Sequence, residues 1–128
     1  MPSERTHHRL VQHNRDFLGT FALDTTPYRD WAVTVMFYAA LHLVECYLAR
    51  KDLHPSDHTV RDAYLQRTAG LKPIWTQYRR LKDESQSARY EGATFTAAEA
   101  QRLRTLLAEI EAHITTLLSK QSSPPVHL

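Results

Sequence analysis

A long apolar segment in the first half of the chain restricts the fold more than any other feature. Residues 31–49 read WAVTVMFYAALHLVECYLA, so apolar side chains would cover every side of a helix formed there. Such a helix has to be surrounded by other helices or by a partner subunit. The segment is long enough to cross a membrane, but Thr34, His42 and Glu45 would be costly in hydrocarbon. We therefore predict that residues 27–51 form the core helix of an all-α protein and do not span a membrane.

Four further helices follow from the spacing of apolar residues and from helix-capping signals. We expect them at residues 3–22, from Ser56 or Asp57 to about residue 68, from about residue 72 to 90, and from the Thr96 to Glu99 capping box to about residue 120. Short connections favour antiparallel neighbours, so the prediction is an up-and-down four-helix bundle with an additional short helix. At 128 residues the chain is expected to form a single domain, residues 1–121, followed by a disordered tail at residues 122–128.

The positive charge is concentrated in the middle of the chain. Residues 50–90 hold nine basic and five acidic side chains, a net charge of +4, whereas the segments on either side each carry −1. Cations that can bind phosphate, beside imidazoles that can act as acid and base, suit RNA. The expected RNA-binding residues are Arg61, Arg79, Arg80, Arg89 and Tyr90. The alternative is that Arg79, Arg80 and Lys82 only solvate an outer helix face.

A second group of polar residues lies inside the apolar segment. Tyr38, His42 and Glu45 follow one another at helical spacing and would form a polar seam along one face. The seam is interpreted mainly as a hydrogen-bonded contact with a neighbouring helix or subunit, and alternatively as a His-Glu pair in a functional cleft. His54 and His58, with Arg50, are the candidate acid, base and phosphate-binding groups for catalysis.

Other chemistry finds little support in the sequence. There is no Gly-rich phosphate loop and no nucleophile motif, and neither the His54-x3-His58 spacing nor the single Glu4 to His7 motif suffices for a metal site. We therefore expect no cofactor and no metal. Cys46 is the one cysteine and no apolar export signal opens the chain, which together favour a reducing cytoplasm.

The segment FYAALHLVECYLARKDLHPSDH, followed by ESQSARY, resembles the HEPN family. This resemblance implies a helical bundle that dimerises and acts on or binds RNA, often within a toxin-antitoxin pair with a nucleotidyltransferase-like partner. Active members are metal-independent ribonucleases with an Arg-x4-6-His motif. Here Arg50 and His54 are separated by three residues, and Arg50 and His58 by seven. The expectation is thus a dimeric RNA- or nucleotide-associated binding module, with a ribonuclease or a pure protein-interaction module as alternatives.

Overall fold

The computed structural model describes residues 2–122, which form an all-α structure of five α-helices without a strand in that range. The helices are α1 (Glu4–Leu18), α2 (Arg29–Arg50), α3 (His58–Arg67), α4 (Trp75–Tyr90) and α5 (Ala97–Ser122), with a short 3-10 helix, η1 (Lys72–Ile74), before α4. The predicted fold class is therefore confirmed at the level of an all-α protein. The predicted tail lies outside the described residues, except that Ser122 ends α5.

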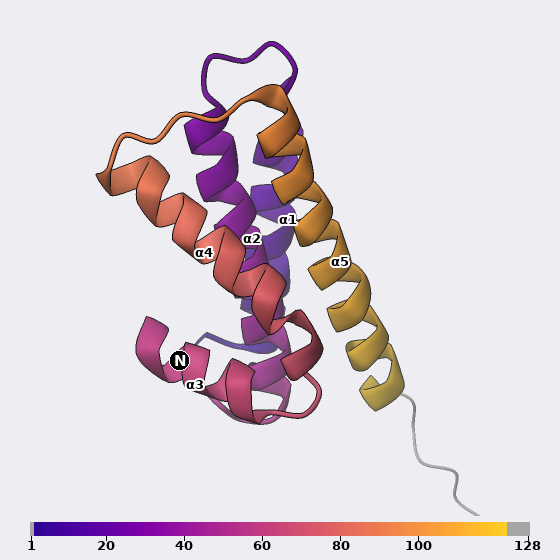
Figure 1. Ribbon diagram of the computed structural model, residues 1–128. Coiled ribbons are helices and arrows are strands. Elements are labelled where there is room, and N and C mark those ends of the chain that lie inside the picture. Colours follow the sequence, from indigo (N-terminus) through magenta and orange to yellow (C-terminus); the bar gives the residue numbers. More distant parts are fainter. Residues whose placement is uncertain (1, 123–128) are drawn as a thin grey trace, which may run out of the picture.

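The apolar segment forms the centre of the structure. Helix α2 contacts α1, α4 and α5, and α4 also contacts α5 (Figure 1). Helix α4 crosses this group at an angle, and α3 lies across one end of it (Figure 1). Of the 22 residues of α2, 14 are buried, including Met36, Phe37 and Val44. The chain thus covers its own apolar helix, and that helix does not require a second subunit for its burial.

Helix α2 is also long and apolar enough to cross a membrane by length and composition alone. Its most apolar 18-residue window has a mean hydropathy of 1.6, but 78% of that window is buried inside the fold. The core helix of a helical bundle meets the same criteria, so the burial accounts for the composition.

Capping residues set the start of three helices as the sequence predicted. Ser3 accepts a hydrogen bond from the Thr6 N–H and begins α1, and Asp57 accepts one from the Val60 N–H and begins α3. Thr96 and Glu99 satisfy each other's backbone N–H groups, at 2.9 and 3.1 Å, before α5. These contacts occupy N–H groups that have no partner within the helix.

Several predicted helix boundaries were wrong. Helix α4 begins at Trp75 rather than near residue 72, where the chain forms the 3-10 helix η1 instead. Helix α1 ends at Leu18 rather than residue 22, because a turn follows in which the Thr20 and Phe21 N–H groups bond to the carbonyls of Phe17 and Leu18. Helix α2 begins at Arg29 rather than Pro27, because the Thr26 hydroxyl accepts the Tyr28 N–H in a local turn. Hydroxyl side chains compete with helical hydrogen bonds in this way near helix ends.

Candidate functional site

The polar seam of α2 is the meeting point of three other helices. Tyr38, His42 and Glu45 lie on one face of α2, as the spacing predicted, and each contacts a polar side chain from another element. Glu45 meets His7 of α1 and Arg61 of α3, His42 meets His7, and Tyr38 meets Arg89 of α4. The seam is therefore hydrogen-bonded to neighbouring helices of the same chain. This agrees with its interpretation as a contact between helices.

Glu45 is held by two helices at once. Its Oε1 accepts a hydrogen bond from Nε of Arg61 at 2.7 Å and forms an ion pair with Nη2 of Arg61 at 2.5 Å. Its Oε2 lies 3.0 Å from Nε2 of His7. The carboxylate, the guanidinium and the imidazole are all largely shielded from solvent. A carboxylate with this set of partners offsets the cost of burying Arg61, because each charge has a hydrogen-bonded counterpart.

His7 and His42 face each other across the contact between α1 and α2. Their Nδ1 atoms lie 3.0 Å apart. Nε2 of His7 faces the Glu45 carboxylate at 3.0 Å, and a carboxylate carries no proton of its own, so we assign the His7 proton to Nε2. The Nδ1 of His7 then accepts the Nδ1–H of His42. With this assignment both imidazoles are neutral, and the three side chains form a continuous chain of polar contacts.

The protonation of these histidines agrees with that assignment. Burial lowers the pKa of His7 below its usual range and outweighs the nearby carboxylate of Glu45. Burial also lowers the pKa of His42, and a charge on His7 would lower it further. The pKa of His58 is lowered by burial and by the charge of Arg61, whose Nη1 lies 3.0 Å from the His58 Nδ1. Near neutral pH all three side chains are therefore uncharged imidazoles.

Arg89 forms a different kind of site at the other end of the seam. Its Nη1 donates to the Tyr38 hydroxyl at 2.6 Å and its Nε donates to the Ser85 carbonyl at 3.2 Å. The guanidinium carbon lies 5.4 Å from the centre of the Tyr38 ring and 5.1 Å from that of Tyr90. Among the described residues no carboxylate forms an ion pair with Arg89.

A cleft beside Arg89 gives a ligand access to this cation. The cleft has a volume of about 420 Å³ and is lined by Asp30, Trp31, Thr34, Ala88 and Arg89. Trp31 is 56% exposed and Tyr90 is 77% exposed, which is unusual for aromatic side chains of this size. The cleft is thus lined by an exposed aromatic side chain, Trp31, and by a cation that contacts two further aromatic rings.

The other residues expected to bind RNA are placed differently. Arg79 and Arg80 are exposed on α4 and lie 3.8 Å from Asp83 and Glu84, one turn further along the same helix. Arg61 is only 7% exposed and is bound to Glu45, so its guanidinium is engaged inside the protein rather than presented at the surface. Of the predicted set, Arg89 and Tyr90 are the pair that the structure brings together.

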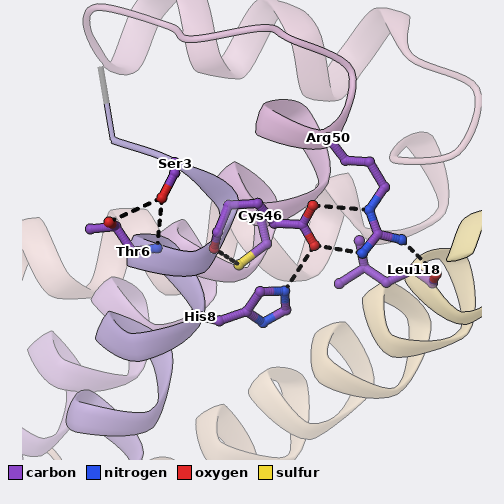
Figure 2. Close-up of polar contacts among 7 residues, drawn as sticks. Ser3, Thr6, His8, Cys46, Arg50 and Leu118 are labelled. Atoms are coloured by element: carbon purple, nitrogen blue, oxygen red, sulfur yellow. Dashed lines mark hydrogen bonds and ion pairs between the residues drawn. The ribbon is translucent and has the colours of Figure 1, made fainter.

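The three candidate catalytic residues do not converge. Arg50 binds both carboxylate oxygens of Glu4 and the backbone carbonyl of Leu118, as the close-up shows (Figure 2). His54 contacts Asp52, and His58 contacts Arg61. No contact among the described residues joins Arg50 to either histidine, so the groups expected to act together have separate partners.

His7 and Trp31 are site residues that the sequence reasoning did not single out. His7 lies in a stripe with Val11 and Leu18, the other buried residues of α1, at intervals of four and seven. That spacing could have predicted from the sequence that the His7 side chain lies on the buried face of α1. Trp31 was counted as part of the apolar segment, and only the helix arrangement reveals that its side chain remains exposed.

Comparisons of the chain with protein-family models, with curated proteins and with solved structures gave no match. What the protein does has therefore to be argued from its own residues.

Proposed function

We propose that this protein is a HEPN-like binding module for single-stranded RNA, with the cleft beside Arg89 as the binding site. The observation that carries the proposal is the position of Arg89, which contacts the rings of Tyr38 and Tyr90 and forms no ion pair with a described carboxylate. A guanidinium in that state can donate two hydrogen bonds to a phosphate. The resemblance of the sequence around α2 and the end of α4 to the HEPN family points in the same direction.

The aromatic side chains supply the second part of the recognition. Single-stranded nucleic acids bind where a basic group contacts the backbone and aromatic rings stack on the bases. Trp31 lines the cleft and Tyr90 lies against the guanidinium of Arg89. We expect a base to stack on one of these rings while Arg89 binds an adjacent phosphate. Tyr38 positions Arg89 through its hydroxyl group.

Fluorescence anisotropy with a labelled single-stranded RNA tests the proposal. Arg89→Ala should weaken binding about tenfold and reduce the slope of log K against log salt by roughly 0.7, the value for one phosphate contact on a single strand. Trp31→Ala should weaken binding about tenfold through lost stacking. Arg79→Ala is the matched control, because it removes an exposed arginine of the same helix, and its affinity should stay within about twofold of wild type.

Two results would contradict RNA binding at this cleft. One is an absence of binding at low salt, and the other is equal weakening by Arg79→Ala and Arg89→Ala. Incubating the same RNA with the protein in EDTA distinguishes binding from cleavage. Cleavage lost in His54→Ala or His58→Ala would instead support the ribonuclease alternative.

A second candidate function is protein interaction, which a cluster of aromatic residues favours, three of them exposed. Phe17 and Phe21 of the first helix and its following turn contact each other at 5.1 Å between ring centres, and with Tyr28 and Trp31 they line a shallow pocket of about 380 Å³. Exposed apolar surface of this kind suits a second copy of the chain or a partner such as a nucleotidyltransferase-like protein. Sedimentation equilibrium of the wild type and Phe17→Ser tests the homodimer, and a monomeric wild type at micromolar concentration would contradict it.

A further inference from the structure

The pair of imidazoles beside Glu45 has the geometry of ligands around a metal ion. One ligand atom from each of His7, His42 and Glu45 lies within 4.8 Å of the others. The Nδ1 atoms of the two histidines lie 3.0 Å apart. Two nitrogens bound to zinc at about 2.0–2.1 Å and a tetrahedral angle lie roughly 3.3–3.4 Å apart. The separation therefore has to grow by a few tenths of an ångström, and both rings have to rotate so that their Nδ1 lone pairs point to one ion instead of to each other.

The protonation of the site also suits a metal ion. Metal binding needs an unprotonated ring nitrogen, and His7 already offers one at Nδ1 because its proton is on Nε2. His42 carries its proton on Nδ1 in the hydrogen-bonded pair, and none of the described residues is bonded to its Nε2. A transfer of that proton to Nε2 frees Nδ1 without changing the charge of the imidazole.

Glu45 and Arg61 would act as the outer part of such a site. A histidine that binds a metal usually donates its other N–H to a carboxylate, which fixes the ring and makes the nitrogen a better ligand. Nε2 of His7 lies 3.0 Å from Oε2 of Glu45, in position for such a contact, and Arg61 binds the opposite oxygen of the same carboxylate. The positive charge of Arg61 lowers the affinity for a cation, so binding should be weaker than at a zinc site with three or four direct protein ligands.

We propose that His7 and His42 bind a divalent transition-metal ion of the zinc class through their Nδ1 atoms, with Glu45 holding His7 and water filling the remaining positions. Imidazole ligands suit zinc, copper, nickel and iron better than magnesium or calcium. The site lies between α1 and α2, so an ion there would join these two helices. Arg89 is not part of it, and the proposal does not depend on RNA binding.

Isothermal titration of EDTA-treated protein without an affinity tag tests the site, with Zn²⁺ as the probe. We expect one ion per chain. His42→Gln should weaken binding at least tenfold, and Glu45→Gln about 10- to 100-fold, as for other carboxylates that hold a metal-bound histidine. His8→Gln is the matched control, because His8 is an exposed neighbour of His7 that contacts Glu4 instead, and it should leave affinity unchanged.

A measurement on the wild-type protein keeps the test decisive if a variant fails to fold. In nitrogen-15 spectra of the histidine rings, Zn²⁺ should shift the Nδ1 signals of His7 and His42 and move the His42 proton to Nε2. The proposal is overturned if Zn²⁺ does not bind, if these signals stay unchanged, or if a folded His42→Gln variant binds as tightly as wild type.

Discussion

Arg50 and Glu4 are 46 residues apart in the sequence, yet their side chains form a two-point ion pair that joins the end of α2 to the start of α1. Nε of Arg50 donates to Oε1 of Glu4 at 3.0 Å, and Nη2 donates to Oε2 at 2.5 Å. The remaining Nη1 donates to the carbonyl of Leu118 in α5 at 2.6 Å. One guanidinium therefore ties three helices together, and its paired geometry makes it stronger than a typical surface ion pair.

Replacing Arg50 should destabilise the protein and alter its response to acid. Arg50→Met should lower the free energy of unfolding by about 1–2 kcal/mol, because partly buried charged hydrogen bonds are lost. Hydrogen bonding to Arg50 lowers the pKa of Glu4 below its ordinary value of 4.5. The stabilisation is therefore present above that pH and is lost as the pH falls further. Urea unfolding from pH 7 to pH 3 should show a smaller acid-dependent loss in Arg50→Met than in wild type.

Arg79→Met is the control for this experiment, because Arg79 is an exposed arginine whose partner lies on its own helix. Its unfolding curve should follow wild type to within about 0.5 kcal/mol at every pH. Equal losses in the two variants would contradict a special role for Arg50.

Acidification should weaken the fold in a second, higher pH range through the histidines. The pKa of His7, His42 and His58 is lowered in the folded protein, mainly by burial. As pH falls below about 6.5, the unfolded chain takes up protons more readily than the folded chain, so the free energy of unfolding decreases. Urea unfolding at pH 7.5, 6.5 and 5.5 should show this decrease, and His42→Gln should reduce it. His13→Gln is the control, because His13 is exposed, and its free energy of unfolding should decrease as steeply as that of wild type. A decrease as shallow as that of His42→Gln would contradict the explanation.

Gly70 should not tolerate a side chain, because the Tyr47 hydroxyl occupies the space. A Cβ atom at Gly70 would lie 2.7 Å from Tyr47 Oη and 3.3 Å from its Cζ. The Gly70 carbonyl is also bonded to Nε2 of His113 at 2.6 Å, which restricts movement of the backbone. Gly70→Ala should cost about 1–3 kcal/mol, the usual range for overpacking.

The double variant Gly70→Ala with Tyr47→Phe identifies the cause. Removing the hydroxyl removes the closest contact, so the alanine should cost less in the Tyr47→Phe background than in wild type. Thermal or urea unfolding of the four proteins completes the cycle. Additive losses would mean that the clash with the hydroxyl is not the reason.

Cys46 should be unreactive as long as the protein is folded. Its side chain is fully buried on α2, and burial raises the pKa of the thiol to about 12. Thiolate is the reactive form, so very little of it exists at pH 8. A thiol reagent such as 5,5′-dithiobis(2-nitrobenzoic acid) should label Cys46 only after denaturant is added. Rapid labelling of the native protein at the rate of a free thiol would contradict this burial.

The sequence predicted those parts of the fold that depend on neighbouring residues. The capping box at Thr96 and Glu99 and the cap at Asp57 involve contacts three residues apart, which spacing alone reveals. The burial of α2 followed from its composition. The start of that helix was missed because the hydroxyl of Thr26 competes with a helical start at Pro27.

The candidate site was less accessible to sequence reasoning because its contacts join distant helices. Tyr38, His42 and Glu45 were placed correctly on one face, since that placement follows from helical periodicity. Their partners were not predicted. Arg61 appeared as a surface cation because arginine usually is one, and only the position of α3 across one end of the helix group brings it to Glu45. The resemblance to the HEPN family likewise rested on individual segments of the sequence. It therefore gave no information about contacts between helices.

The double contact of Glu45 has a consequence for how this sequence can diverge. Arg61 and His7 lie on different helices, and each depends on the same carboxylate. Loss of the carboxylate would leave the buried guanidinium of Arg61 without a counter-charge. This would destabilise the fold far more than replacing all three side chains by apolar residues. Positions 7, 45 and 61 should therefore covary in related proteins, and a homologue that lacks an acid at position 45 should also lack the arginine at position 61.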